Sequence, residues 1–170
     1  MKTKKRLGEA YLELRRRHPI ERIRVTEVCR LAGSNRTTFY HYFEDIYALN
    51  NSVEDLILEE CLADFPCRGM IYTDPIRFLN EFLNALHSRC EDLTYLADGR
   101  KKEQYHKLSR WLVELGKRDD QNKKEEFILT FVIGGISEVI SANRLGDLAP
   151  KETIRSYLEQ IIPPLLQTKL

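Results

Sequence analysis

Apolar and polar positions alternate along most of the chain with the period of amphipathic helices. This period predicts helices, and proline or glycine marks where each of them ends. The segments that show it lie at about residues 2–17, 25–32, 36–43, 44–65, 75–90, 100–116, 123–145 and 150–167. We therefore predict an all-α fold. In the helix predicted over about 44–65, Glu44 and Asp45 would stand in the first turn, where they suit the helix dipole. The apolar positions that would mark its inner face are Ile46, Leu49, Val53, Leu56 and Ile57.

The segment from Val25 to Phe43 predicts two short helices separated by a turn. Gly33 can take the left-handed conformation that ends the first helix, and Ser34 or Asn35 can cap the second. Phe39 and Phe43 are four residues apart and would pack inward. The side chains left to face outward or sideways are Arg36, Thr37, Tyr40, His41 and Tyr42. This pattern is typical of a helix-turn-helix motif, and these groups can bond phosphates and base edges.

The same segment carries a family resemblance. Its pattern is Gly33-x-x-Arg36-x-Thr38-Phe39-Tyr40-x-Tyr42-Phe43, followed by the acidic Glu44. It resembles the DNA-binding signature of the tetracycline-repressor (TetR) family of bacterial transcription regulators, over about residues 5–55. Two positions depart from that family. Arg24 stands where a capping Thr or Ser is usual, and Ile46 stands where a Lys usually begins the next helix.

The resemblance implies two domains and a set of DNA-binding residues. A three-helix DNA-binding domain would occupy residues 1–48, and a helical dimerisation and effector-binding domain would occupy residues 49–170. Thr37 and His41 would face base edges, and Arg36 would reach a base or a flanking phosphate. The predicted DNA-binding residues are Thr26, Arg36, Thr37, Thr38, Tyr40, His41 and Tyr42.

Charge is divided along the chain in a way that suits this reading. Residues 1–50 hold eleven Lys or Arg against six Asp or Glu, whereas the whole chain has a net charge of only +1. A basic N-terminal region followed by a mildly acidic remainder is expected of a protein whose N-terminal region faces double-stranded DNA. We find neither a membrane-length apolar run nor a signal peptide, so we expect a cytoplasmic protein with no membrane partner.

The two last predicted helices are more apolar than one core face requires, and they resemble the dimer-forming pair of the family. We therefore expect a homodimer, although central helices of a monomeric bundle would give a similar pattern. Gly134 and Gly135 would allow another helix to approach closely. The predicted dimer residues are Phe127, Phe131, Gly135, Ile136, Ile154, Leu158 and Ile161.

An aromatic stripe in the middle of the chain allows two interpretations. It can line a pocket for a small-molecule effector, or it can simply fill the core, as such stripes more often do. The residues are Phe78, Phe82, Tyr95, Tyr105 and Trp111.

The four cysteines lack paired C-x-x-C spacing, so we interpret them as reduced thiols. A metal site from Cys61, Cys67, His87 and Cys90 is conceivable but disfavoured. We expect no metal, no cofactor and no enzymatic activity, because no catalytic motif accompanies the scattered histidines.

The sequence thus predicts a dimeric, sequence-specific DNA-binding transcription regulator. It would repress nearby genes, and a small molecule could release it. The alternative is an interaction protein or co-regulator on the same fold, which acts through a partner without binding DNA by itself. Arg24 and Ile46 are the only residues that favour the alternative.

Overall fold

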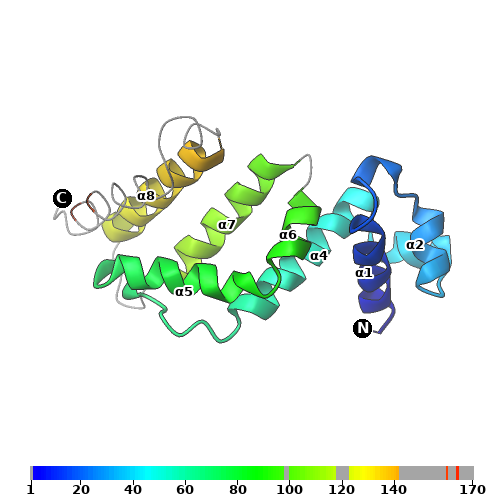
Figure 1. Cartoon of the computed structure of the whole chain (residues 1–170), viewed down its shortest axis with the longest axis horizontal. Helices are drawn as coiled ribbons and strands as arrows, with labels where there is room; N and C mark the ends of the chain where they lie inside the picture. Colours follow the sequence, from blue (N-terminus) through cyan, green and yellow to red (C-terminus); the bar gives the residue numbers. More distant parts are fainter. Residues whose placement is uncertain (1, 98–99, 118–122, 142–159, 161–163, 165–170) are drawn as a thin grey trace. The chain divides into compact units, whose positions relative to one another are not determined.

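The computed structural model describes residues 2–97, 100–117, 123–141, 160 and 164 (Figure 1). Within these residues the regular structure is entirely helical, with eight α-helices, two short 3₁₀-helices and no strand. The predicted all-α class is therefore confirmed for the described part of the chain. In that part, no helix has both the length and the apolar character needed to cross a membrane.

The helices follow one another with short connections. Their bounds are α1 Lys2–Arg15, η1 Ile20–Arg22, α2 Val25–Leu31, α3 Arg36–Tyr42, α4 Ile46–Leu62, η2 Met70–Tyr72, α5 Pro75–His87, α6 Cys90–Ala97, α7 Lys101–Gly116 and α8 Lys123–Ser141.

Three local predictions need correction. The Glu44-Asp45 pair was expected in the first turn of α4, but Asp45 precedes that helix and caps it by accepting the Ala48 N–H at 2.7 Å. One helix was expected to continue past His87 to Cys90, whereas α5 ends at His87 and a separate helix, α6, begins at Cys90. Leu56 was assigned to the inner face of α4, yet 42% of it is exposed.

The chain forms two compact units, and the first comprises Met1–Ala63 and Leu86–Gly99. Its core is built where α1 packs on α2 and α4, and where α2 packs on α3. The Tyr11 hydroxyl crosses this core and donates to the Asn50 side-chain oxygen at 2.8 Å. Gly8 lets α1 and α4 approach closely, because an added Cβ would lie 3.3 Å from a methyl carbon of Val53.

Ion pairs to the buried carboxylate of Asp92 attach α6 to this first unit. Arg16 of α1 contacts Asp92 at 2.7 Å, and Arg89 contacts it at 2.9 Å. Arg15 donates to the Tyr95 carbonyl and, at 2.8 Å, to the His18 carbonyl. The contacts of Arg16 with Asp92 and of Arg15 with Tyr95 join residues 76 and 80 positions apart, which explains why helical periodicity alone did not place α6.

The second unit comprises Asp64–Ala85 and Arg100–Leu170. Phe78 of α5 is fully buried and meets Phe65 edge to face, with ring centroids 5.3 Å apart. Helices α7 and α8 pack along each other. At the end of α7, the Leu115 carbonyl accepts the Gly69 N–H at 2.8 Å. A Cβ on Gly116 would lie 3.1 Å from side-chain carbons of Ile71 and Leu129, so these segments are tightly packed.

The division predicted between residues 48 and 49 is implied by the family resemblance, and it stays a prediction. The two compact units are defined by the packing within each of them, and not by function.

Candidate nucleic-acid interface

A tight turn at Gly33 joins α2 to α3. Gly33 has φ of 57°, and its N–H donates to the Arg30 carbonyl at 3.3 Å. The Ser34 N–H donates to the Cys29 carbonyl at 2.9 Å. Together these two bonds form a Schellman motif, which satisfies carbonyls at the end of α2. The prediction of two short helices broken at Gly33 is confirmed.

Gly33→Ala should destabilise the protein by about 1–2 kcal/mol, since an L residue with a Cβ pays that much in the left-handed region. An added Cβ at Gly33 has no neighbour within 4 Å, so the loss would come from the backbone alone. Gly33→Asn is the matched control and should cost less, because asparagine tolerates this conformation. Urea denaturation measures both, and equal losses for the two variants would contradict the assignment.

Asn35 fixes the start of α3. Its side-chain oxygen accepts the Thr38 N–H at 2.8 Å, so of the two predicted caps Asn35 is the one used. Phe39 is fully buried and Phe43 is 5% exposed, as the spacing predicted. Their ring centroids lie 5.6 Å apart. One face of α3 is therefore anchored in the core, and the rotation of the helix about its axis is fixed.

The rest of the surface of α3 carries polar side chains that are exposed to solvent. Tyr40 and Tyr42 are 49% and 39% exposed, and the Arg36 guanidinium lies 5.8 Å from the centre of the Tyr40 ring. Thr38 is half-buried. The exposed residues of this surface are Arg36, Thr37, Tyr40, His41 and Tyr42. Guanidinium, hydroxyl and imidazole groups on a seven-residue helix can donate to phosphates and read base edges.

The two positions that differ from the tetracycline-repressor pattern lie at the starts of α2 and α4. Arg24 is the N-cap of α2, and its N–H donates to the Glu27 carboxylate at 3.0 Å. Arginine has no side-chain acceptor, so this is the only half of a capping box that Arg24 can complete. Ile46 is half-buried at the start of α4. Thr26 is exposed on α2.

Basic side chains line the exposed side of α1, in the same unit as α3. Lys2, Lys4, Lys5 and Arg6 are all exposed. Lys4 Nζ lies 5.8 Å from the centre of the Phe43 ring, which follows α3 directly. Exposed positive charges of this kind can attract an anion such as a DNA phosphate.

The cysteines have free thiols. Burial raises the pKa of the Cys29 thiol, and nearby Arg36 only partly offsets that effect. Burial likewise raises the pKa of the Cys61 thiol. Neutral thiols are poor nucleophiles and poor metal ligands. Among the described residues, no three His, Cys, Asp or Glu side chains are grouped to hold a metal ion.

The five residues of the aromatic stripe do not lie in one unit. Phe78 and Phe82 are buried in the second unit, where Tyr105 and Trp111 of α7 are half-buried. Tyr95 is 39% exposed on α6, which belongs to the first unit.

Helix α8 buries one side and exposes an aromatic pair on the other. Leu129 is fully buried, whereas Phe127 and Phe131 are 66% and 69% exposed. Their rings are stacked, with centroids 6.3 Å apart and planes 16° from parallel. Gly135 is also exposed, with no atom near an added Cβ. Of the other predicted dimer residues, only the backbone of Ile136 is described, and Ile154, Leu158 and Ile161 lie outside the described residues.

Comparison with family models, curated proteins and solved structures gave no match.

Proposed function

We propose that this protein is a sequence-specific DNA-binding transcription regulator with an N-terminal helix-turn-helix domain, similar to the tetracycline-repressor family. The observation that carries the proposal is the two-sided character of α3. Phe39 and Phe43 fix one side in the core, and the other side presents Arg36, Thr37 and His41 to solvent. A recognition helix needs both properties, because base reading requires polar groups held in a defined orientation.

The basic residues of α1 support the same proposal. Lysines beside a recognition helix neutralise phosphates and release counterions, which makes affinity depend steeply on salt. The protein would bind a near-palindromic duplex as a homodimer, with half-sites about one helical turn apart or slightly more. Helix α8 and the segment 150–167 would form the dimer interface, and the regulator would act as a repressor of nearby genes.

An effector, if the protein uses one, would be mostly apolar or aromatic and would bind between α5 and α7. It could release the operator only by binding the two states of the protein with different affinity. A ligand-bound structure with its pocket elsewhere would contradict this part of the proposal.

A second candidate is a co-regulator on the same fold that needs a partner to reach DNA. Arg24 and Ile46 favour it, because both replace residues that often touch the DNA backbone in the family.

A gel shift with the purified protein and its own promoter region separates the two candidates. We expect a specific complex that forms without a partner, survives competition by unrelated DNA and weakens strongly between about 50 and 200 mM salt. Failure to form any specific complex at low salt, with the protein folded and dimeric, would favour the co-regulator instead.

A further inference from the structure

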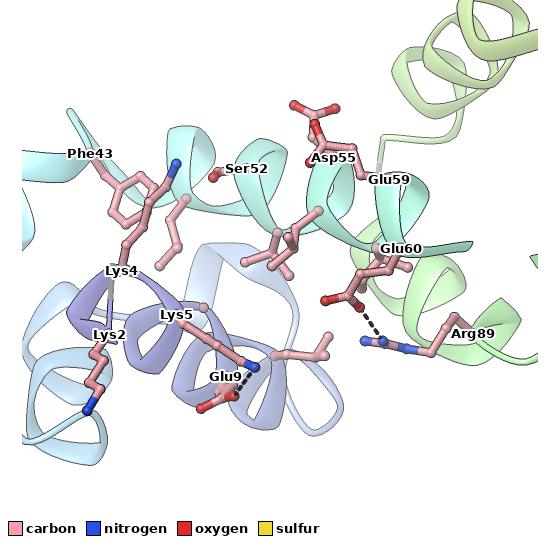
Figure 2. A pocket seen from close by; sticks show the side chains of 16 residues that line it. Lys2, Lys4, Lys5, Glu9, Phe43, Ser52, Asp55, Glu59, Glu60 and Arg89 are labelled. Carbon is pink, nitrogen blue, oxygen red and sulfur yellow. Dashed lines mark hydrogen bonds and ion pairs between the residues drawn. The ribbon is translucent and has the colours of Figure 1, made fainter. Parts of the chain in front are cut away.

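An open groove runs between α1 and α4 within the first unit (Figure 2). Its volume is about 910 Å³, in the range of sites that bind ligands or short segments of a partner. We call it the α1–α4 groove. Its apolar lining consists of Gly8, Leu12, Phe43, Leu49, Val53, Leu56 and Ile57.

Leu56 is much more exposed than its neighbours in this apolar lining. Leucine at 42% exposure, next to the buried Val53 and Ile57, adds solvated apolar area to the groove. A covering partner would remove that area from water, at about 25 cal/mol per Å². At Gly8 the two helices that border the groove approach closely, since an added Cβ would lie 3.3 Å from a methyl carbon of Val53.

The two ends of the groove differ in net charge, and Figure 2 shows Lys4 and Lys5 with Glu9 toward one end and Glu60 with Arg89 toward the other. Lysines from α1 surround one end, where Lys5 pairs only loosely with Glu9 at 4.0 Å. Carboxylates from α4 surround the other end, where Glu60 is paired with Arg89 at 3.1 Å. The charged lining residues toward the basic end are Lys2, Lys4, Lys5 and Glu9, and those toward the acidic end are Asp55, Glu59, Glu60 and Arg89.

We propose that the α1–α4 groove docks an amphipathic helix of a partner protein, acidic at one end and basic at the other. An open groove between two helices suits a third helix, whose apolar side chains at i, i+3, i+4 and i+7 would cover Leu56 and its neighbours. The charge pattern selects the occupant, because a dipolar helix satisfies both ends at once. An anionic amphiphile would match the lysines but would meet the carboxylates unfavourably. The proposal goes beyond DNA binding and does not rest on it.

Synthetic helical peptides of about four turns test the proposal on the full-length protein. Three peptides share the same leucines and differ only in charge: one has Glu in its first turn and Lys in its last, one has only Glu and one has only Lys. We expect the dipolar peptide to bind at least about tenfold more tightly than the other two. When the dipolar peptide binds, the amide chemical shifts of the protein should change along α1 and α4.

Two variants locate the binding. Leu56→Lys should abolish binding of the dipolar peptide, and Glu59→Lys should weaken it about tenfold while favouring the all-Glu peptide. Both positions are exposed, so the variants should keep the melting temperature of the parent. Glu21→Lys is the matched control, because Glu21 is exposed on η1 outside the groove and should change nothing.

Four outcomes would overturn the proposal. The three peptides could bind equally, or the shift changes could lie away from the groove. Decanoate, as an anionic amphiphile, could occupy the groove more tightly than the dipolar peptide. Finally, Leu56→Lys could change the oligomeric state of the protein, which would make the occupant a second copy of this chain.

Discussion

Phe131→Lys should turn the proposed dimer into a monomer at micromolar concentration. Phe131 is 69% exposed on α8 and stacks on Phe127, which is 66% exposed, so a partner would bury both rings. Burying one phenylalanine contributes about 1.5–3 kcal/mol, and a two-fold interface contains each residue twice. The loss is therefore about 3 kcal/mol or more, which raises the dissociation constant at least about a hundredfold.

Light scattering at several protein concentrations measures this change. Asn80→Lys is the matched control, because Asn80 is exposed on α5, outside the proposed interface, and receives the same charge without removing an aromatic ring. It should remain dimeric, and both variants should remain folded by circular dichroism. If the unmodified protein is monomeric at micromolar concentration, or if Phe131→Lys still dimerises like the parent, α8 does not form the interface.

Thr37→Ala and His41→Ala should each relax base preference at a defined operator position. Both residues are exposed one turn apart on α3, so they would meet successive bases in a major groove. Loss of a good base contact costs about 1–3 kcal/mol at that base, or up to roughly 150-fold in discrimination. Arg36→Ala should have a comparable effect if the guanidinium reaches a base rather than a phosphate.

Tyr42→Phe is the contrasting variant. It removes one exposed hydroxyl while keeping the ring, and a lost phosphate contact should weaken all sequences alike. Competition binding on a randomised operator library distinguishes the two kinds of loss. If the Thr37 and His41 variants select the same sequence as the parent and lose affinity uniformly, these residues do not read bases.

Local sequence determined the elements around the candidate interface. Gly33 could be assigned to the turn because its left-handed backbone excludes most other residues, and the four-residue spacing of Phe39 and Phe43 set the buried side of α3. The end of α7 at Gly116 and the start of α5 at Pro75 likewise follow from local chemistry. These features depend on neighbours within one or two helical turns, so periodicity and capping rules are sufficient to find them.

Only the tertiary structure decided which distant segments meet. Helix α6 belongs to the first unit because Asp92 pairs with Arg16, a residue of α1 that no local pattern connects to it. Leu56 follows the apolar period of α4, but its exposure depends on how closely another element covers it. The α1–α4 groove and its two charged ends therefore could not be predicted from sequence. A helical period identifies an apolar face, whereas burial of that face depends on a partner far away in the chain.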